Sequence, residues 1–533
     1  MVSRAVAVAA LAAVTLGCSR ELRPEPAAGP AKEATLVFTS ELKGSLAPCG
    51  CSESMRGGID RAAFQVAQLR KTRPVLLLDT GDALFGTKSV GDEAVAQQER
   101  KAKAVAQGLL AMGLVATAPG PLDDARGAAF RTGLGLPEVG PDEAKALDVG
   151  GFAVVVARSS RLATLATLAG QARAAKASVV VGLFEGPYDE ALKADVEALD
   201  LLVATRGRDE WSTEENRLAM FKTPVVQVQS KGRSLLRVDL HLRDATRVQW
   251  LKSPSETQRE LEALGQRIEL LRAQVNDPSM DAELRALKKA KLEEVVARRE
   301  ALAAEQVPVP ERGNAASVRF VPLEASFEKL PEVTALVTAY DRDVGELNLA
   351  WAKEHGVECE APEPGKPSYT GSGVCIGCHM AAWLAWKGTK HPHGYESLAA
   401  EGKQHHLDCV GCHVTGWKER GGVCRIDQVE GKTEVGCEAC HGPGSGHVSV
   451  PVKATIVRPT TAQACTGCHD RENSPHFEFE KYLPRILGPG HGLPMPDAGV
   501  AELDAGVTDA GAPDAGVKSR KSPRKQPREP SGR

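Results

Sequence analysis

The chain has 533 residues, of which 25% are charged, with 66 Lys and Arg against 69 Asp and Glu. A chain of this length exceeds what one hydrophobic core usually serves, so we expect two folded domains with appendages. The formal net charge of −3 leaves no bulk electrostatic argument for nucleic-acid binding. The 13 cysteines are clustered, which indicates bound groups or disulfides rather than scattered buried thiols.

Residues 1–18 have the layout of a secretory signal peptide, with Arg4, an apolar run over 5–16, and then Gly17 and Cys18. The apolar run is too short to span a membrane. A cysteine at this point resembles the end of a bacterial lipoprotein signal, which implies a lipid anchor on Cys18 and a place in the periplasm or outer membrane. Plain signal cleavage is the alternative. Residues 19–34 are rich in Pro, Ala and charge, and we predict a tether there.

Apolar runs typical of buried strands alternate with helical stretches between residues 35 and 245. This alternation predicts an α/β layered domain over 35–245. The predicted strands are 35–40, 74–79, 152–156, 178–182, 201–204 and 225–229, and a helix is predicted over 61–71.

Three further segments follow this domain. Residues 255–306 have apolar side chains at helical spacing, interrupted near Asn276, and predict a helical hairpin that is either a spacer arm or an interaction surface. Residues 314–360 predict a connecting strand and helix. Residues 496–533 repeat Asp-Ala-Gly and end in a basic run, a composition that cannot bury a core, so we predict a disordered tail.

The pattern Cys-x-x-Cys-His occurs four times within residues 367–492. It is typical of a c-type haem site, because the two thiols bond to the haem vinyl groups while the histidine ligates the iron. Structural zinc also uses Cys-x-x-Cys pairs, but zinc sites separate the histidines from the pair. We therefore predict a mostly α or irregular domain with four covalently bound haems. The attachment residues are Cys375, Cys378, His379, Cys409, Cys412, His413, Cys437, Cys440, His441, Cys465, Cys468 and His469.

The second axial ligand of each iron separates electron transfer from small-molecule chemistry. The same segment supplies further histidines that could fill this position, which makes four bis-histidine irons feasible. These histidines are His391, His393, His405, His406, His447, His476 and His491.

Residues 386–398, 409–416, 436–447 and 473–479 resemble the cytochrome c-554 family of multihaem cytochromes, and the resemblance extends over about 369–491. It implies electron transfer, with redox proteins or quinol-linked carriers as partners. It also implies that His391 and His447 are distal ligands, each to a haem other than the one attached nearest in sequence, and that His491 is a third. One haem in this family can lack a strong distal ligand. A multihaem oxidoreductase acting on a small nitrogen or sulfur species at a five-coordinate haem is therefore the alternative.

Residues 36–44, 57–61, 76–82 and 223–233 resemble the N-terminal domain of 5′-nucleotidases and related metallophosphatases, which hold two metals with Asp, His and Asn ligands. Several positions depart from that pattern. Asp-x-His becomes Glu41-Leu-Lys43, Asn-His becomes Pro121-Leu122, and Gly-His-x-His becomes Thr205-Arg-Gly-Arg208, so that only Asp82 remains. Cationic side chains at such positions repel a metal ion. We predict a non-catalytic scaffold without phosphatase activity, and residual metal-dependent phosphoesterase activity is the alternative.

Cys49 and Cys51 lie in the loop after the first predicted strand, where the metal cleft of the resembled family would open. A disulfide that closes so small a ring is strained and easily reduced, which favours a redox-active or metal-binding pair. Pairing of these two thiols with Cys359 or Cys424 is the alternative, since an exported chain is oxidisable.

Overall fold

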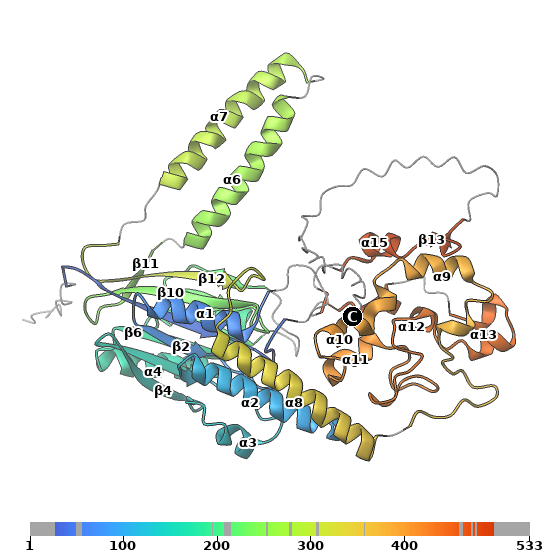
Figure 1. Ribbon diagram of the computed structural model, residues 1–533. Helices are drawn as coiled ribbons and strands as arrows, with labels where there is room; N and C mark the ends of the chain where they lie inside the picture. The colour runs from blue at the N-terminus through green and yellow to red at the C-terminus, as the bar shows by residue number, and fades with distance from the viewer. Residues whose placement is uncertain are drawn as a thin grey trace, which may run out of the picture.

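The computed structural model describes residues 27–48, 56–194, 196–206, 215–251, 254–276, 280–304, 309–356, 358–457, 462–470, 473–474 and 477–494. It comprises an α/β part, a projecting helical hairpin and a C-terminal part of short helices (Figure 1). Predictions for Cys18, Cys49, Cys51, Arg208 and His476 fall on positions outside these ranges and stay predictions.

The first sheet has six strands in the order β11-β12-β10-β1-β2-β3. Strand β1 runs parallel to β2 and antiparallel to β10, which in turn pairs antiparallel with β12. The bounds are β1 (Lys32–Thr39), β2 (Val75–Asp79), β3 (Leu114–Thr117), β10 (Ser234–Leu242), β11 (Val248–Trp250) and β12 (Asn314–Pro322).

The second sheet also has six strands, in the order β4-β5-β6-β7-β9-β8. Its inner face packs on the inner face of the first sheet, and residues such as Phe38, Val154 and Val181 are fully buried between them. The two sheets therefore share one core, with helices on both outer faces (Figure 1). The bounds are β4 (Glu143–Val149), β5 (Phe152–Ser159), β6 (Val179–Pro187), β7 (Leu201–Arg206), β8 (Arg217–Ala219) and β9 (Val225–Gln227).

Helices cover the outer face of each sheet. The first sheet carries α1 (Ile59–Arg70), α2 (Val95–Ala111) and α8 (Pro331–His355), and the second carries α4 (Leu162–Ala174) and α5 (Tyr188–Ala191). The short α3 (Ala128–Gly133) precedes β4.

Helix α8 lies alongside α2 because one of its faces is apolar. Its buried residues Val333, Val337, Tyr340 and Val344 recur at spacings of three and four, which is the period of one helix face. The α/β part thus includes residues well beyond the predicted boundary at 245. Strand β12 and helix α8, predicted as a separate connector over 314–360, instead complete its first sheet and cover it.

The predicted hairpin is formed by α6 (Pro254–Val275) and α7 (Ala282–Ala304), and it projects away from the sheets (Figure 1). Ile268, Leu271 and Val295 are buried between its two helices. Across the described ranges, no helix combines the length and apolar character needed to cross a membrane.

The C-terminal part has little regular structure and a small apolar core of its own. Its buried residues Val410, Val414, Val423 and Ile426 join Ala352 of α8. A segment this long with so few buried side chains needs an additional stabilising group. Its elements are α9 (Met380–Lys387), α10 (Gly394–Ala400), α11 (Leu407–His413), α12 (Cys437–His441), α13 (Ser445–Ser449), α14 (Gln463–Thr466), α15 (Phe479–Tyr482), β13 (Gly488–Pro489) and β14 (Gly492–Leu493).

A disulfide joins Cys359 to Cys424. The alternative in which Cys49 or Cys51 pairs with one of these residues is therefore wrong. Ion pairs hold the same two segments together, because Arg420 contacts Glu363 at 2.9 Å and Arg425 contacts Glu358 at 3.1 Å. Such contacts bring the two thiols together without the N-terminal pair.

Candidate functional sites

Three pairs of histidine rings face one another in the C-terminal part. The ring centroids are 6.1 Å apart for His379 and His447, and 6.2 Å apart for His391 and His469. For His441 and His491 the separation is 6.4 Å. A metal–imidazole nitrogen bond of about 2 Å puts the ring centroid roughly 3 Å from the metal, so two imidazoles on opposite sides of one iron lie about 6 Å apart. Each pair has the spacing that one haem iron requires.

The second ring nitrogen of several of these histidines is fixed by a backbone carbonyl. A carbonyl only accepts hydrogen bonds, so the ring Nδ1 carries the proton and donates, and Nε2 keeps its lone pair for a metal. The arrangement sets both the tautomer and the orientation of each ring. The donating Nδ1 atoms and their acceptors are His413 to Gly394 (2.6 Å), His441 to Val457 (3.0 Å), His447 to Val452 (3.1 Å) and His491 to Ile486 (2.8 Å).

The remaining candidate histidines make other contacts. The Nδ1 atom of His393 lies 2.8 Å from a carboxylate oxygen of Glu396 on the surface. His406 is 4% exposed, and its Nε2 lies 3.2 Å from the Asp341 carbonyl oxygen. His405 lies next to Gly345 of α8. These three residues therefore lie against the surface or against α8.

Thiols from motifs that are distant in sequence contact each other. The side chains of Cys375 and Cys437 lie within hydrogen-bonding reach of each other. The side chains of Cys412 and Cys468 do so as well. The first and third motifs are thus neighbours, as are the second and fourth.

A buried carboxylate inside the third motif ties it to the first. Glu438 is 2% exposed, and it accepts hydrogen bonds from the amides of Thr370, Gly371 (2.7 Å) and Gly444 (2.6 Å). Residues 370 and 371 lead directly into the first motif. We did not predict a role for Glu438 from the sequence, although it is the only charged residue among the variable positions of the four motifs.

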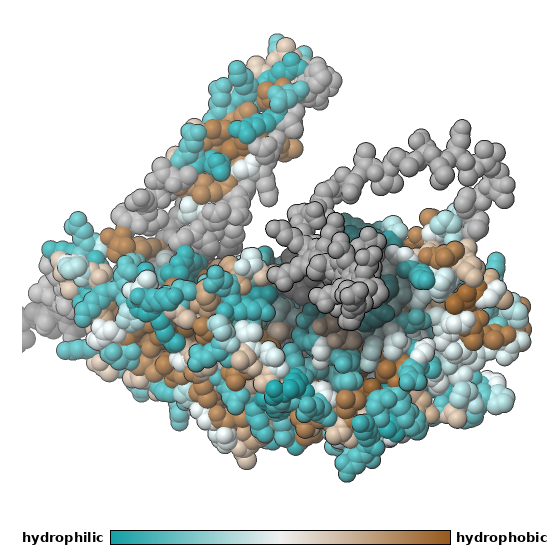
Figure 2. Space-filling view, in the orientation of Figure 1, coloured by the Kyte–Doolittle hydropathy of each residue, from teal (hydrophilic) through white to brown (hydrophobic). Residues whose placement is uncertain are grey.

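Large apolar side chains are exposed around the motifs. Each is between 49% and 60% exposed, whereas a soluble surface normally covers such residues. Figure 2 shows apolar surface over the region of α9 and α13. A planar apolar macrocycle held between facing imidazoles would cover these side chains, so the residues present fit haem. They are Val374, Met380, Leu384, Val448, Val450, Val452, Val457 and Leu493.

A lysine lies beside a carboxylate just after β1 in the α/β part. The Lys43 Nζ lies 3.4 Å from Glu41 Oε2, and both side chains are buried. Glu41, Lys43 and Asp82 all adopt left-handed backbone conformations, with φ of 43°, 49° and 51°. Such strain in residues other than glycine is typical of functional sites. The Lys43 ammonium therefore places a positive charge beside the buried Glu41 carboxylate.

Asp79 and Asp123, two further aspartates of the α/β part, are buried. Asp123 accepts hydrogen bonds from the amides of Asp82 and Leu84, both at 2.8 Å. Burial, together with repulsion from Asp82, raises the pKa of Asp123 to about 7. Burial also raises the pKa of Asp79 to about 6. Both carboxyls are therefore held in an environment that disfavours their charged forms.

We expect the α/β part to become less stable as pH rises from 5 to 8. An unfolded aspartate titrates near pH 4, so between about pH 4 and pH 7 the folded chain holds a proton on Asp123 that the unfolded chain has released. The contribution of Asp123 to the free energy of unfolding is fully present below about pH 4. It is lost as pH rises to about 7, by up to about 4 kcal/mol. Urea unfolding followed by far-ultraviolet circular dichroism measures it.

The matched variants are Asp123→Asn and Asp124→Asn. Asp123→Asn is expected to flatten the pH dependence of the free energy of unfolding between pH 5 and pH 8. The second alters a half-exposed neighbour that pairs with Arg131, and the slope should remain. A slope that is unchanged in Asp123→Asn contradicts the prediction.

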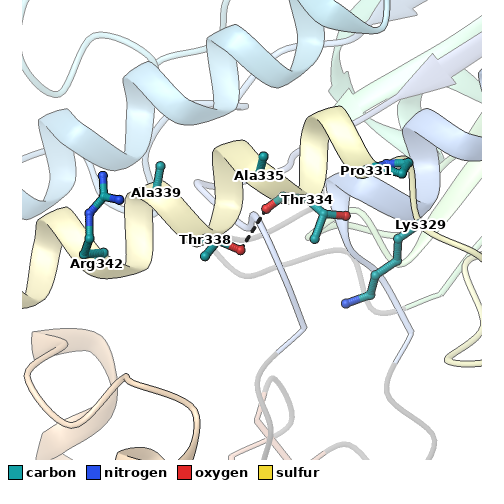
Figure 3. Close-up of a pocket in the computed structure, with 7 residues that line it drawn as sticks. All are labelled: Lys329, Pro331, Thr334, Ala335, Thr338, Ala339 and Arg342. Carbon is teal, nitrogen blue, oxygen red and sulfur yellow. Dashed lines mark hydrogen bonds between the residues drawn. The ribbon is translucent and has the colours of Figure 1, made fainter.

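A hollow of about 590 Å³ lies on the outer face of α8 (Figure 3). Its lining includes Thr334 and Thr338, whose hydroxyls donate to the backbone carbonyls of Leu330, just before the helix, and of Thr334. Lys329 and Arg342 at its ends pair with Asp60 and Asp343. The polar groups of this hollow thus have partners within the α/β part, and its lining contains none of the motif residues.

The chain thus joins a two-sheet α/β part to a segment with four Cys-x-x-Cys-His motifs and facing imidazoles, which is an arrangement suited to c-type haem. Residues 374–442 match the family described as Cytochrome c554 and c-prime. This match confirms the predicted resemblance of the C-terminal part, and it implies covalently bound c-type haem.

Solved structures similar to the chain include 5′-nucleotidases and related enzymes. A 5′-nucleotidase precursor from Thermus thermophilus has a TM-score of 0.36 at 13% identity, over 70% of this chain and 68% of that one. The sulfate thiohydrolase SoxB of the same organism has a TM-score of 0.37 at 15% identity, over 62% of this chain and 64% of that one. The NAD nucleotidase of Haemophilus influenzae has a TM-score of 0.38 at 12% identity, over 64% of this chain and 65% of that one. The chain spans about half to two thirds of the length of such structures. No curated protein matches it.

Proposed function

We propose that this protein transfers electrons at the cell envelope through four covalently bound haems. The observation that carries the proposal is the set of three facing imidazole pairs, each joining a motif histidine to a histidine from elsewhere in the segment. At the three irons that these pairs would hold, two axial histidines leave no open position, which favours electron exchange over binding of a substrate. His413 of the second motif is not a member of these three pairs. The signal-like residues 1–18 support the location.

The protein residues have three tasks in this proposal. The motif thiols attach each haem, and carbonyl acceptors such as those of Val457 and Ile486 hold the ligating rings in place. The exposed apolar side chains around the motifs exclude water from the haem faces. Contact between the first and third motifs, and between the second and fourth, keeps the haems of each such pair close together. Each haem supplies one-electron chemistry.

The α/β part acts as a non-catalytic scaffold in this proposal. The buried pair of Lys43 and Glu41 supports this, because a positive side chain at this position opposes the binding of a metal ion. Failure of the purified protein to hydrolyse nucleotides with added manganese or zinc is the expected result.

Haem counting tests the proposal directly. The protein produced with a cytochrome c maturation system is expected to contain four haems per chain, measured by pyridine haemochromogen absorbance and intact mass. The double variant Cys409→Ser/Cys412→Ser removes both thioether bonds of one haem and should lose a quarter of the haem. The matched control Cys359→Ser/Cys424→Ser removes two cysteines that form a disulfide and should keep all four.

Two results would contradict the proposal. Zinc in place of haem, or a haem content that the motif variant leaves unchanged, removes the basis for a four-haem chain. A large spectral shift of the wild-type protein on adding cyanide or hydroxylamine would instead favour an oxidoreductase with an open iron.

A further inference from the structure

The helix that carries the second motif is docked directly on the α/β part. Helix α11 begins at Leu407 and Asp408, immediately before Cys409. The Asp408 carboxylate accepts hydrogen bonds from Lys101 Nζ (2.5 Å) and Gln98 Nε2 (2.9 Å), which both belong to α2. The first turn of a haem-attachment helix is therefore held by side chains of the other domain.

A buried amide fixes the start of the same helix. Gln97 is 0% exposed, and its Oε1 accepts hydrogen bonds from the Leu407 amide (3.0 Å) and from Asn348 Nδ2 (2.6 Å). Asn348 of α8 also donates to the His405 carbonyl at 2.8 Å. Backbone groups on both sides of His406 are thus tied to α2 and α8, which leaves α11 little freedom to shift.

Lys101 also determines the net charge beside this motif. Desolvation acts to raise the pKa of Asp408, but the charge of Lys101 and its hydrogen bond outweigh this effect and lower it. Asp408 is therefore ionised, and Lys101 balances it. Ferric haem carries one more positive charge than ferrous haem, so an unbalanced carboxylate nearby stabilises the ferric form and lowers the reduction potential.

We propose that Lys101 is a positioning and charge-balancing residue for the haem attached at Cys409 and Cys412, and that it keeps the reduction potential of this haem higher than Asp408 alone would allow. The proposal rests on the proposed function. It gives the non-catalytic domain a specific role, which is to make one haem of the chain differ from the others.

The test uses the full-length protein with its haems attached. Spectropotentiometric titration of Lys101→Met is expected to show one of the four haems shifted to a lower potential, with the other three unchanged. Lys101→Arg keeps the charge and should titrate like the wild type. The double variant Lys101→Met/Asp408→Asn removes both charges and should restore the potential.

Lys103→Met is the matched control. Lys103 lies two residues further along α2, is exposed and sits over the ring of Phe130, so its loss changes the net charge equally without touching α11. A shift of equal size in Lys103→Met, a shift spread over all four haems, or no shift in Lys101→Met at full haem content would overturn the proposal. Peptide masses taken beforehand show whether haem is attached at Cys409, and its absence there contradicts the proposed function itself.

Discussion

Replacing His447 with alanine is expected to convert one of the four haems from low spin to high spin while the haem content stays complete. His447 faces the motif histidine His379 at 6.1 Å between ring centroids. Removal of its imidazole leaves one axial position open, whereas the thioether bonds of Cys375 and Cys378 are untouched. Absorption and electron paramagnetic resonance spectra measure the change, and the new open site should bind cyanide.

The control for this substitution is His393→Ala. His393 lies in the same segment, but it is exposed and pairs with Glu396. Its loss should leave all haems in their wild-type spin states. A low-spin spectrum that is unchanged in His447→Ala would show that another side chain ligates that iron and would remove His447 from the ligand set.

Glu438→Gln is expected to destabilise the C-terminal part by about 2–4 kcal/mol. The carboxylate is buried and accepts backbone amides from both Gly371 and Gly444. A glutamine presents an NH₂ group where one of these amides needs an acceptor, so one buried donor loses its partner. The substituted position lies between the two thiols of the third motif, and the first motif is loosened with it.

Guanidinium unfolding followed by Soret absorption measures this loss. The comparison variant Glu430→Gln alters an exposed carboxylate in the same domain and should change stability by less than about 0.5 kcal/mol. Equal midpoints for the two variants would mean that Glu438 does not connect the motifs.

The sequence predicted those motifs and elements that a pattern of a few consecutive residues defines. The four attachment motifs are of this kind, as is the buried run of β2. Strand β10 was missed, although its apolar residues alternate over much of its length, because its partners β1 and β12 lie far away along the chain. The first sheet also includes residues beyond the predicted boundary at 245, since β12 pairs with β10. The chain leaves the first sheet, forms the hairpin and then returns to it through β12.

The composition of the candidate haem sites could be predicted, but their pairing could not. The sequence supplies His391, His447 and His491 as candidate ligands, and only the folded chain shows which motif histidine each one faces. The sequence also does not show which cysteine pairs with Cys359, since any two cysteines of an exported protein can form a disulfide. Glu438 was missed because its acceptor role depends on backbone amides from two other segments.

The buried pair of Lys43 and Glu41 has a consequence for the order in which the protein matures. A lysine is synthesised with the chain, so the charge of Glu41 is balanced as soon as this part of the chain folds. The α/β part can then be complete while the motifs still await their haems. Helix α2 would already present Lys101, Gln97 and Gln98 to the segment that receives the second haem. The earlier domain would in this way serve as a template for the later one.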